Sequence, residues 1–181
     1  MNILALLADG FEETEFVVPF DLWQRGGCEV VTASIKGSTN VTGAHGLPVQ
    51  ANTTLGQINL ADFDGIFLPG GGPGVKNLAA SPAVEKALCA MNDADKWIFA
   101  ICAAPLVLSK AGLLVDRRCT CFPGCEEDLV CKEFTEDRVV VDGNIITSRG
   151  AGTAEEFALA TLASMTDAET SGKIRKQIVA R

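Results

Sequence analysis

Residues 97–108 read Trp-Ile-Phe-Ala-Ile-Cys-Ala-Ala-Pro-Leu-Val-Leu, an apolar run that passes directly into a helical apolar pattern. The run Trp97–Ile101 predicts a buried strand, and Cys102 stands at the turn into the following helix. A turn this short holds its corner side chain in a strained, accessible position above the sheet, as in a nucleophile elbow. A helix N-terminus favours negative charge, so we expect the Cys102 thiol to be more acidic than a free thiol. The alternative is an inert, buried cysteine.

Strand and helix patterns alternate along the rest of the chain. Strands are expected at 2–7, 29–34, 65–68 and 97–101, short strands at 41–43 and 48–51, and a further strand around 119–121. A hairpin is expected from 138–141 and 144–147 across Asp142-Gly143, and helices at 13–26, 82–93, 153–165 and 168–181. This alternation predicts one α/β domain over residues 1–181, with a mostly parallel sheet covered on both faces. Ligands of such sheets bind beyond the carboxyl ends of the strands.

Composition narrows the classes of partner. The net charge of −8 disfavours nucleic acid and anionic membranes through repulsion. No apolar stretch reaches the roughly 18 residues that span a bilayer. The first residues predict a strand rather than a signal peptide, so a cytoplasmic location is expected. Seven cysteines, an odd number, favour reduced thiols over a disulfide framework.

A glycine-rich loop, Leu68-Pro-Gly-Gly-Gly-Pro-Gly74, follows the third long strand. Successive glycines allow close backbone approach, so Gly70 and Gly71 are candidates to place N–H donors near Cys102 as an oxyanion hole. A phosphate site is disfavoured, because no Lys-Ser or Lys-Thr follows the glycines.

Three acidic residues lie where the first strand becomes a helix. Glu12 and Glu13 suit the first helical turn as partners of the helix dipole. Glu15 lies further inside, next to the apolar run that begins at Phe16. If Glu15 points towards Cys102, burial raises its pKa, and the protonated carboxyl can donate a hydrogen bond to the thiolate.

Several motifs, in order along the chain, resemble one family. They are Leu-Ala-Asp-Gly-Phe-Glu-Glu-Thr-Glu (7–15), Leu-Pro-Gly-Gly (68–71), Ala-Ile-Cys-Ala (100–103), and Thr-Ser-Arg-Gly-Ala-Gly-Thr (147–153) with Glu-Phe-Ala-Leu (156–159). Together they resemble the ThiJ/PfpI superfamily, in its DJ-one and YajL-like branch, over essentially the whole chain.

The resemblance implies a flavodoxin-like three-layer sandwich that forms a homodimer, with the helix that Glu15 enters in the dimer face. It implies that Cys102 is an oxidisable nucleophile and that Glu15 is its protonated partner. The implied backbone donors near the sulfur are Gly70 and Gly71, together with Ala103 at the elbow. It also implies that Arg25 and Arg149 lie near the reactive site, where they can hold an anion.

The chain lacks one histidine that is typical of this family. Phe122, in Thr-Cys-Phe-Pro (120–123), stands where relatives carry that residue, and the only histidine is His45, in a surface segment. A Cys-His peptidase needs a base within hydrogen-bond reach of the sulfur. A peptidase is therefore disfavoured.

A cluster of further cysteines follows the elbow helix: Cys119, Cys121, Cys125 and Cys131. A metal site is disfavoured, since there is no Cys-x-x-Cys pair and no nearby histidine. Structural packing is the first expectation, and a redox role with Cys102 is the alternative, with Cys119, Cys121 and Cys125 as its candidates.

Two functions remain open. In the first, the protein protects against reactive aldehydes such as methylglyoxal, as a glyoxalase or deglycase that uses Cys102, Glu15 and backbone donors without cofactor or metal. In the second, it is an oxidative-stress sensor and redox-regulated chaperone in which Cys102 is oxidised to sulfinate.

Overall fold

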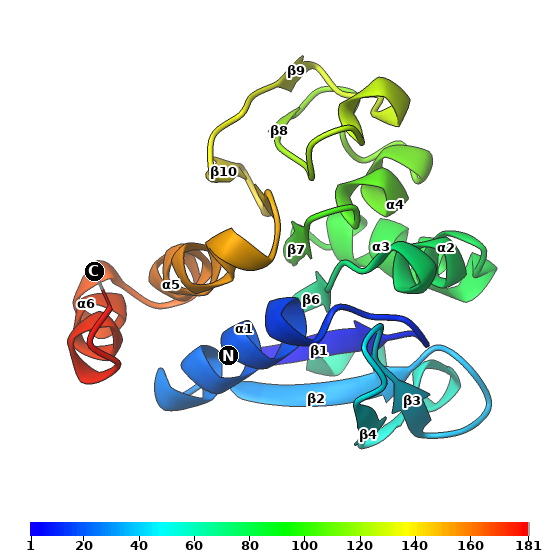
Figure 1. Cartoon of the computed structure of the whole chain (residues 1–181), viewed down its shortest axis with the longest axis horizontal. Coiled ribbons are helices and arrows are strands. Elements are labelled where there is room, and N and C mark those ends of the chain that lie inside the picture. Colours follow the sequence, from blue (N-terminus) through cyan, green and yellow to red (C-terminus); the bar gives the residue numbers. More distant parts are fainter. Residues whose placement is uncertain (181) are drawn as a thin grey trace.

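A seven-stranded sheet forms the centre of the computed structural model, which describes residues 1–180 (Figure 1). Its strands lie in the order β10 (Val139–Asp142), β11 (Ile145–Ser148), β7 (Trp97–Ile101), β6 (Gly65–Leu68), β1 (Asn2–Leu7), β2 (Glu29–Ser34) and β5 (Thr53–Thr54). Neighbouring strands are parallel except for the β10–β11 hairpin at one edge. The predicted mostly parallel sheet is confirmed.

Alternate residues of β1 divide the interior into two cores. Leu4 and Leu6 pack with helices α2 (Gly72–Ala79), α3 (Pro82–Asp93) and α4 (Pro105–Lys110). Ile3 and Ala5 point to the other face, towards α1 (Glu13–Arg25), α5 (Ala154–Met165) and α6 (Ala168–Gln177). Figure 1 shows these two groups of helices on either side of the sheet, which confirms the three-layer sandwich.

The four long parallel strands and α3 have the predicted bounds. Helix α2 was not predicted, because it begins inside the glycine-rich loop. Gly71 precedes it with φ +94°, and Pro73 lies in its first turn, where the missing proline N–H costs no helical bond. The last helix was expected to reach Arg181; α6 ends at Gln177, and Arg181 lies outside the described residues.

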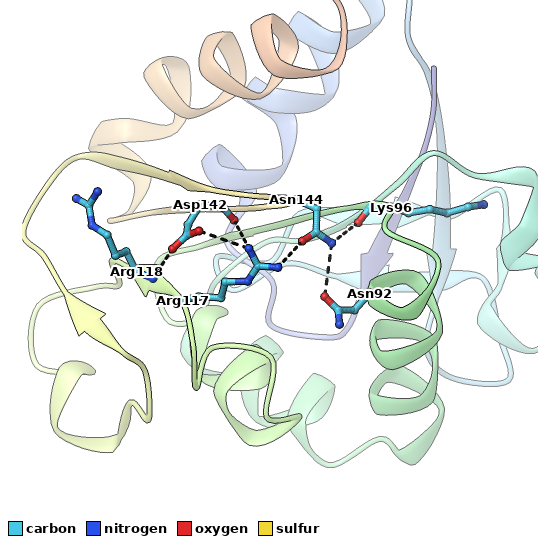
Figure 2. A network of polar contacts seen from close by, with 6 residues as sticks. All are labelled: Asn92, Lys96, Arg117, Arg118, Asp142 and Asn144. Atoms are coloured by element: carbon cyan, nitrogen blue, oxygen red, sulfur yellow. Dashed lines mark hydrogen bonds and ion pairs between the residues drawn. The ribbon is translucent and has the colours of Figure 1, made fainter.

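The edge hairpin turns one residue later than predicted. Asp142 still pairs with Ile145, so the turn is Gly143-Asn144 rather than Asp142-Gly143. Figure 2 shows how the side chains of Asp142 and Asn144 are fixed. Asp142 accepts the Arg118 N–H at 2.7 Å, and Asn144 binds the Arg117 guanidinium at 3.1 Å and the Lys96 carbonyl at 2.9 Å.

Two smaller sheets lie outside the central one. The expected short strands are β3 (Asn40–Thr42) and β4 (Pro48–Gln50), which pair antiparallel. The strand expected around 119–121 is β8 (Arg118–Cys119), which pairs with β9 (Glu133–Phe134) instead of joining the main sheet. Residues 118–134 are called the β8–β9 segment below; Figure 1 shows it projecting beyond α4. Within the described residues, no helix is long and apolar enough to cross a membrane.

Candidate active site at the Cys102 elbow

Cys102 follows the last residue of β7 in a left-handed conformation, with φ +66°. Its N–H donates to the Ser148 carbonyl at 2.9 Å, and its carbonyl accepts the Phe122 N–H at 2.8 Å. A positive φ costs a non-glycine residue about 1–2 kcal/mol, so these flanking bonds hold a strained corner in place. The side chain stays partly exposed.

Glu15 reaches this corner from the first turn of α1. Its side chain is 1% exposed, and its carboxylate accepts the Gly70 N–H at 3.0 Å and the Ala151 N–H. The same carboxyl is hydrogen-bonded to the Cys102 thiol. Glu12 caps the helix by accepting the Glu15 N–H at 2.6 Å, which fixes the turn that carries Glu15. Sequence reasoning missed Ala151, because a backbone donor leaves no residue-type signal.

Burial and mutual contact set the protonation of this pair. Burial raises the pKa of Glu15 to about 7, although the Cys102 contact and the two backbone donors act in the opposite direction. Burial, and then the charge and hydrogen bond of Glu15, raise the pKa of the Cys102 thiol to about 12. Since each group's ionisation opposes the other's, the pair loses one proton near neutrality and holds the second well above neutral pH.

The expectation of an acidic thiol is therefore wrong for the cysteine considered alone. Helix α4 has only six residues and begins with Pro105, which has no N–H to offer. Burial outweighs the small dipole of such a helix. A thiolate forms at neutral pH only in the state in which Glu15 holds the remaining proton of the pair.

Two backbone donors face the sulfur, and they differ partly from those expected. The N–H groups of Gly71 and Ala103 hydrogen-bond Cys102 and lower the pKa of its thiol. The N–H of Gly70 binds Glu15 instead. Gly70 is required sterically, since a Cβ there would overlap the Glu15 carboxylate and lie 2.5 Å from the Cys102 Cβ.

Within residues 1–180, the two expected arginines contact other groups. Arg25 lies in the last turn of α1, about 15 Å along the helix from Glu15, and pairs with Asp21 at 2.7 Å. The Arg149 guanidinium lies 6.0 Å from the centre of the Phe134 ring, and its charge acts on Cys121. Its Nη1 is buried and finds no hydrogen-bond partner in residues 1–180.

Phe122 lies at the Cys102 elbow, whereas His45 pairs with Glu13. The Phe122 backbone lies on the elbow, and its ring packs against Gly150, whose ideal Cβ position is 3.2 Å from the ring and 3.7 Å from the Glu15 carboxylate. His45 is exposed, and its Nδ1 lies 2.7 Å from a Glu13 oxygen. This pairing raises the pKa of His45 and ties the imidazole to Glu13 rather than to Cys102.

The cysteine cluster lies in the β8–β9 segment. Cys119 and Cys121 are buried, while Cys125 and Cys131 are partly exposed. Among residues 1–180, the one group of three possible ligand atoms within 4.8 Å of one another comes from Glu12, Glu13 and His45, not from the sulfurs. Glu12 already caps α1 and Glu13 already pairs with His45.

Fold and site together define a class: an α/β sandwich that presents a cysteine on a strained strand-to-helix elbow, against a buried carboxyl. The sequence profile described as the DJ-1/PfpI family matches residues 1–164, and the chain belongs to this family.

Similar proteins span most or all of this chain. A Drosophila melanogaster protein, dj-1beta, is 37% identical over 99% of this chain and 95% of its own length. DJ-1 homolog B of Arabidopsis thaliana is 36% identical over 99% of this chain, which spans only 42% of that relative. A protein of Pyrococcus abyssi named a deglycase is 35% identical over 84% of this chain and 92% of its own length. The crystal structure of a Salmonella typhimurium DJ-1 superfamily protein superposes with a TM-score of 0.96, at 34% identity, and covers 99% of this chain and 98% of that one.

Proposed function

We propose that this protein is a cysteine-dependent protective enzyme that acts on reactive aldehydes, as a cofactor-independent glyoxalase or deglycase. The observation that carries the proposal is the hydrogen bond between the buried Glu15 carboxyl and the Cys102 thiol, since the pKa of Glu15, raised to about 7, suits a group that both gives and takes a proton. The relative named a deglycase supports the same reaction class.

The first step is attack of the Cys102 thiolate on the aldehyde carbon of methylglyoxal. A sulfur–carbon bond forms, and the carbonyl π electrons move onto oxygen. The N–H groups of Gly71 and Ala103, which hydrogen-bond the sulfur, are the donors that we assign to this developing charge. Glu15 then gives its proton to the oxygen, which leaves a hemithioacetal and a carboxylate.

The second step moves a proton between neighbouring carbons. The Glu15 carboxylate takes the proton from the carbon bonded to sulfur, which leaves an enediolate, and returns it to the adjacent carbon. The hydroxyl proton of the carbon bonded to sulfur moves to the oxygen of the adjacent carbon, so that the first carbon becomes a carbonyl and the second an alcohol. The product is a thioester of lactate on Cys102. Water cleaves the thioester, lactate leaves, and the pair regains its shared proton. No histidine is needed, which agrees with the pairing of His45 to Glu13.

Turnover of methylglyoxal to lactate tests this proposal. We expect activity in the wild-type protein, none in Cys102→Ser, and full activity in the matched control Cys89→Ser, a partly exposed cysteine on α3. Absence of lactate formation by the wild-type protein, or equal activity of Cys102→Ser, contradicts it.

A second candidate function is redox sensing with a chaperone role. Cys102 is partly exposed, and the donors that face its sulfur suit an anionic oxidised sulfur equally well. Two equivalents of peroxide would each transfer one oxygen to the sulfur and leave as water, giving a sulfinate. Mass spectrometry should then find two added oxygens, lost in Cys102→Ser, and the oxidised protein should suppress aggregation of an unfolded client. A chaperone effect without lactate formation would favour this function.

We also propose that the protein is a homodimer through α1. Val17 is an exposed apolar residue on this helix, and a groove of about 520 Å³ beside it is lined by α1 residues, Glu155 of α5 and Ile178. An exposed apolar surface of this kind is typical of an interface. Light scattering should give twice the chain mass, and Val17→Asp should give the monomer. A monomeric wild-type protein contradicts this assignment.

A further inference from the structure

Four of the seven cysteines lie in the β8–β9 segment, and the chemistry proposed for Cys102 uses none of them. Two of the four are in contact. The thiol of Cys119, at the end of β8, is hydrogen-bonded to the thiol of Cys131, which lies two residues before β9. Cys119 is fully buried and Cys131 is partly exposed. The contact therefore joins a buried cysteine to a partly exposed one.

The backbone around this pair holds the two sulfurs together. On one side, the Lys132 N–H donates to the carbonyls of Leu114 and Arg117, at 3.2 and 3.0 Å. On the other side, the Thr135 N–H donates to the Cys119 carbonyl at 3.0 Å. Cys119 belongs to the apolar cluster on this face of the sheet, and Cys131 packs against the same cluster. The approach of the sulfurs is thus set by two chain segments bonded to each other.

The start of the segment is also fixed to the main sheet. Figure 2 shows Arg117 and Arg118 bound to Asp142 in the edge hairpin, and Arg117 bound to Asn144. A frame that already brings two thiols into contact removes most of the entropy cost of joining them.

We propose that Cys119 and Cys131 form a second redox site, a dithiol that a hydroperoxide converts into a disulfide independently of Cys102. Cys131 reacts first because it is the exposed partner: its sulfur takes one oxygen from the peroxide, water or an alcohol leaves, and a sulfenic acid forms. The Cys119 sulfur then attacks the sulfenic sulfur. The S–S bond forms, the S–O bond breaks, and the hydroxyl leaves as water with the Cys119 proton. Each disulfide consumes one peroxide, and a dithiol reductant restores both thiols.

The disulfide would close a loop that supports the elbow. Residues 119–131 include Phe122, whose N–H donates to the Cys102 carbonyl, and Thr120, whose N–H donates to the Thr147 side chain at 3.0 Å. Oxidation would join the two ends of this loop covalently and so reduce its freedom to move away from Cys102.

The neighbouring sulfurs offer a competing pair. Cys121 and Cys125 flank a tight turn in which the Cys125 N–H donates to the Phe122 carbonyl at 3.0 Å. Cys121 is buried, and its sulfur interacts with that of Cys125. An experiment on the cluster must therefore separate two possible disulfides.

The sequence allows that separation, because trypsin releases residues 119–132 as one peptide between Arg118 and Lys132. A glutamate-specific protease then cuts after Glu126 or Glu127, which separates Cys131 from Cys119, Cys121 and Cys125. A Cys119–Cys131 disulfide keeps the two pieces joined, whereas a Cys121–Cys125 disulfide leaves them separate.

Cys102→Ser protein should be treated with hydrogen peroxide, and its remaining thiols alkylated. We expect a loss of two hydrogens per chain that dithiothreitol reverses, with joined pieces after the double digestion. The crosslink should disappear in Cys119→Ala and Cys131→Ser and persist in Cys121→Ser and Cys89→Ser. Should Cys119→Ala not fold, the Cys121→Ser/Cys125→Ser double variant decides, because Cys119 and Cys131 are then the only cysteines left in the tryptic peptide: loss of the crosslink in this variant would overturn the proposal. Separate pieces, or a crosslink that survives loss of Cys131, overturn the proposal.

Discussion

The carboxyl group of Glu15 is hydrogen-bonded to the thiol of Cys102 while it accepts the Gly70 N–H at 3.0 Å. One buried side chain thus connects α1, the loop between β6 and α2, and the elbow after β7. Burial brings the pKa of this carboxyl to about 7, so a proton in the pair is exchangeable at neutral pH. The reactivity of Cys102 therefore depends on Glu15 more than on the short helix α4.

Substitution of Glu15 should separate proton transfer from hydrogen bonding. Glu15→Gln keeps a donor towards the sulfur but cannot move a proton, so methylglyoxal turnover should fall by about 10²- to 10⁴-fold. Peroxide oxidation of Cys102 needs no proton shuttle between carbons and should survive better in Glu15→Gln than in Glu15→Ala. Steady-state lactate formation and mass spectrometry measure the two effects, with Glu13→Gln as the control on the same turn. Wild-type turnover in Glu15→Gln would exclude Glu15 as the shuttle.

The stability of the protein should depend on pH through the same carboxyl. Its pKa is raised from 4.5 to about 7 on folding, so its contribution is fully present below 4.5 and is lost as the pH rises through 7. Glu15→Gln removes this dependence. Between pH 5 and pH 8 the unfolding free energy of the variant should therefore rise relative to wild type, by up to about 3 kcal/mol. Urea unfolding at the two pH values measures the change, and a constant difference would show that Glu15 does not titrate in this range.

Gly70 should tolerate no side chain, whereas its neighbour Gly72 should. A methyl group at Gly70 overlaps the Glu15 carboxylate and Cys102, while a Cβ at Gly72 meets nothing within 4 Å. We expect Gly70→Ala to lose turnover and about 1–3 kcal/mol of stability, as overpacking of a closed site does. Gly72→Ala should change the stability by less than about 1 kcal/mol. Equal behaviour of the two variants in activity and thermal unfolding would contradict the close packing described for Gly70.

The positive φ of Cys102 predicts that glycine is tolerated at this position at least as well as alanine. In most positions glycine is less stable than alanine by about 0.5–1 kcal/mol. At φ +66° the alanine retains a penalty of about 1–2 kcal/mol that glycine lacks. Cys102→Gly should therefore be at least as stable as Cys102→Ala in urea unfolding. An alanine variant that is the more stable by about 1 kcal/mol would mean that the elbow is not strained.

Much of the fold follows from local sequence patterns that do not depend on contacts with residues distant in sequence. Continuous apolar runs place β1, β2, β6 and β7 at their observed bounds, because a strand buried on both faces needs them. The sequence pattern does not predict helix α2, because glycine and proline usually break helices. Both residues nevertheless suit its first turn. The hairpin turn shifted by one residue because contacts from Arg117 and Arg118, distant in sequence, fix Asp142 and Asn144.

The site was partly predictable for a similar reason. Residue type and position indicate that Cys102 and Glu15 lie at the same sheet edge, where parallel strands end. They do not indicate which N–H points at which acceptor. Only the structure shows that the Gly70 N–H binds Glu15 and that the Gly71 N–H binds the Cys102 sulfur. The sequence predicts a lowered pKa for Cys102, whereas the structure raises it. Burial is a tertiary property that the local sequence does not show, and it outweighs the dipole of a six-residue helix.

The central claim is that Glu15 and Cys102 share one proton at neutral pH. The pH dependence of Cys102 alkylation by iodoacetamide, measured by mass spectrometry of its peptide, tests this most directly. We predict that the rate rises in a step centred near pH 7, where the pair loses its first proton, and then stays level through the mildly alkaline range. The step near pH 7 should be absent in Glu15→Gln. A single rise near the usual thiol pKa of about 8.5, identical in both proteins, would contradict the account.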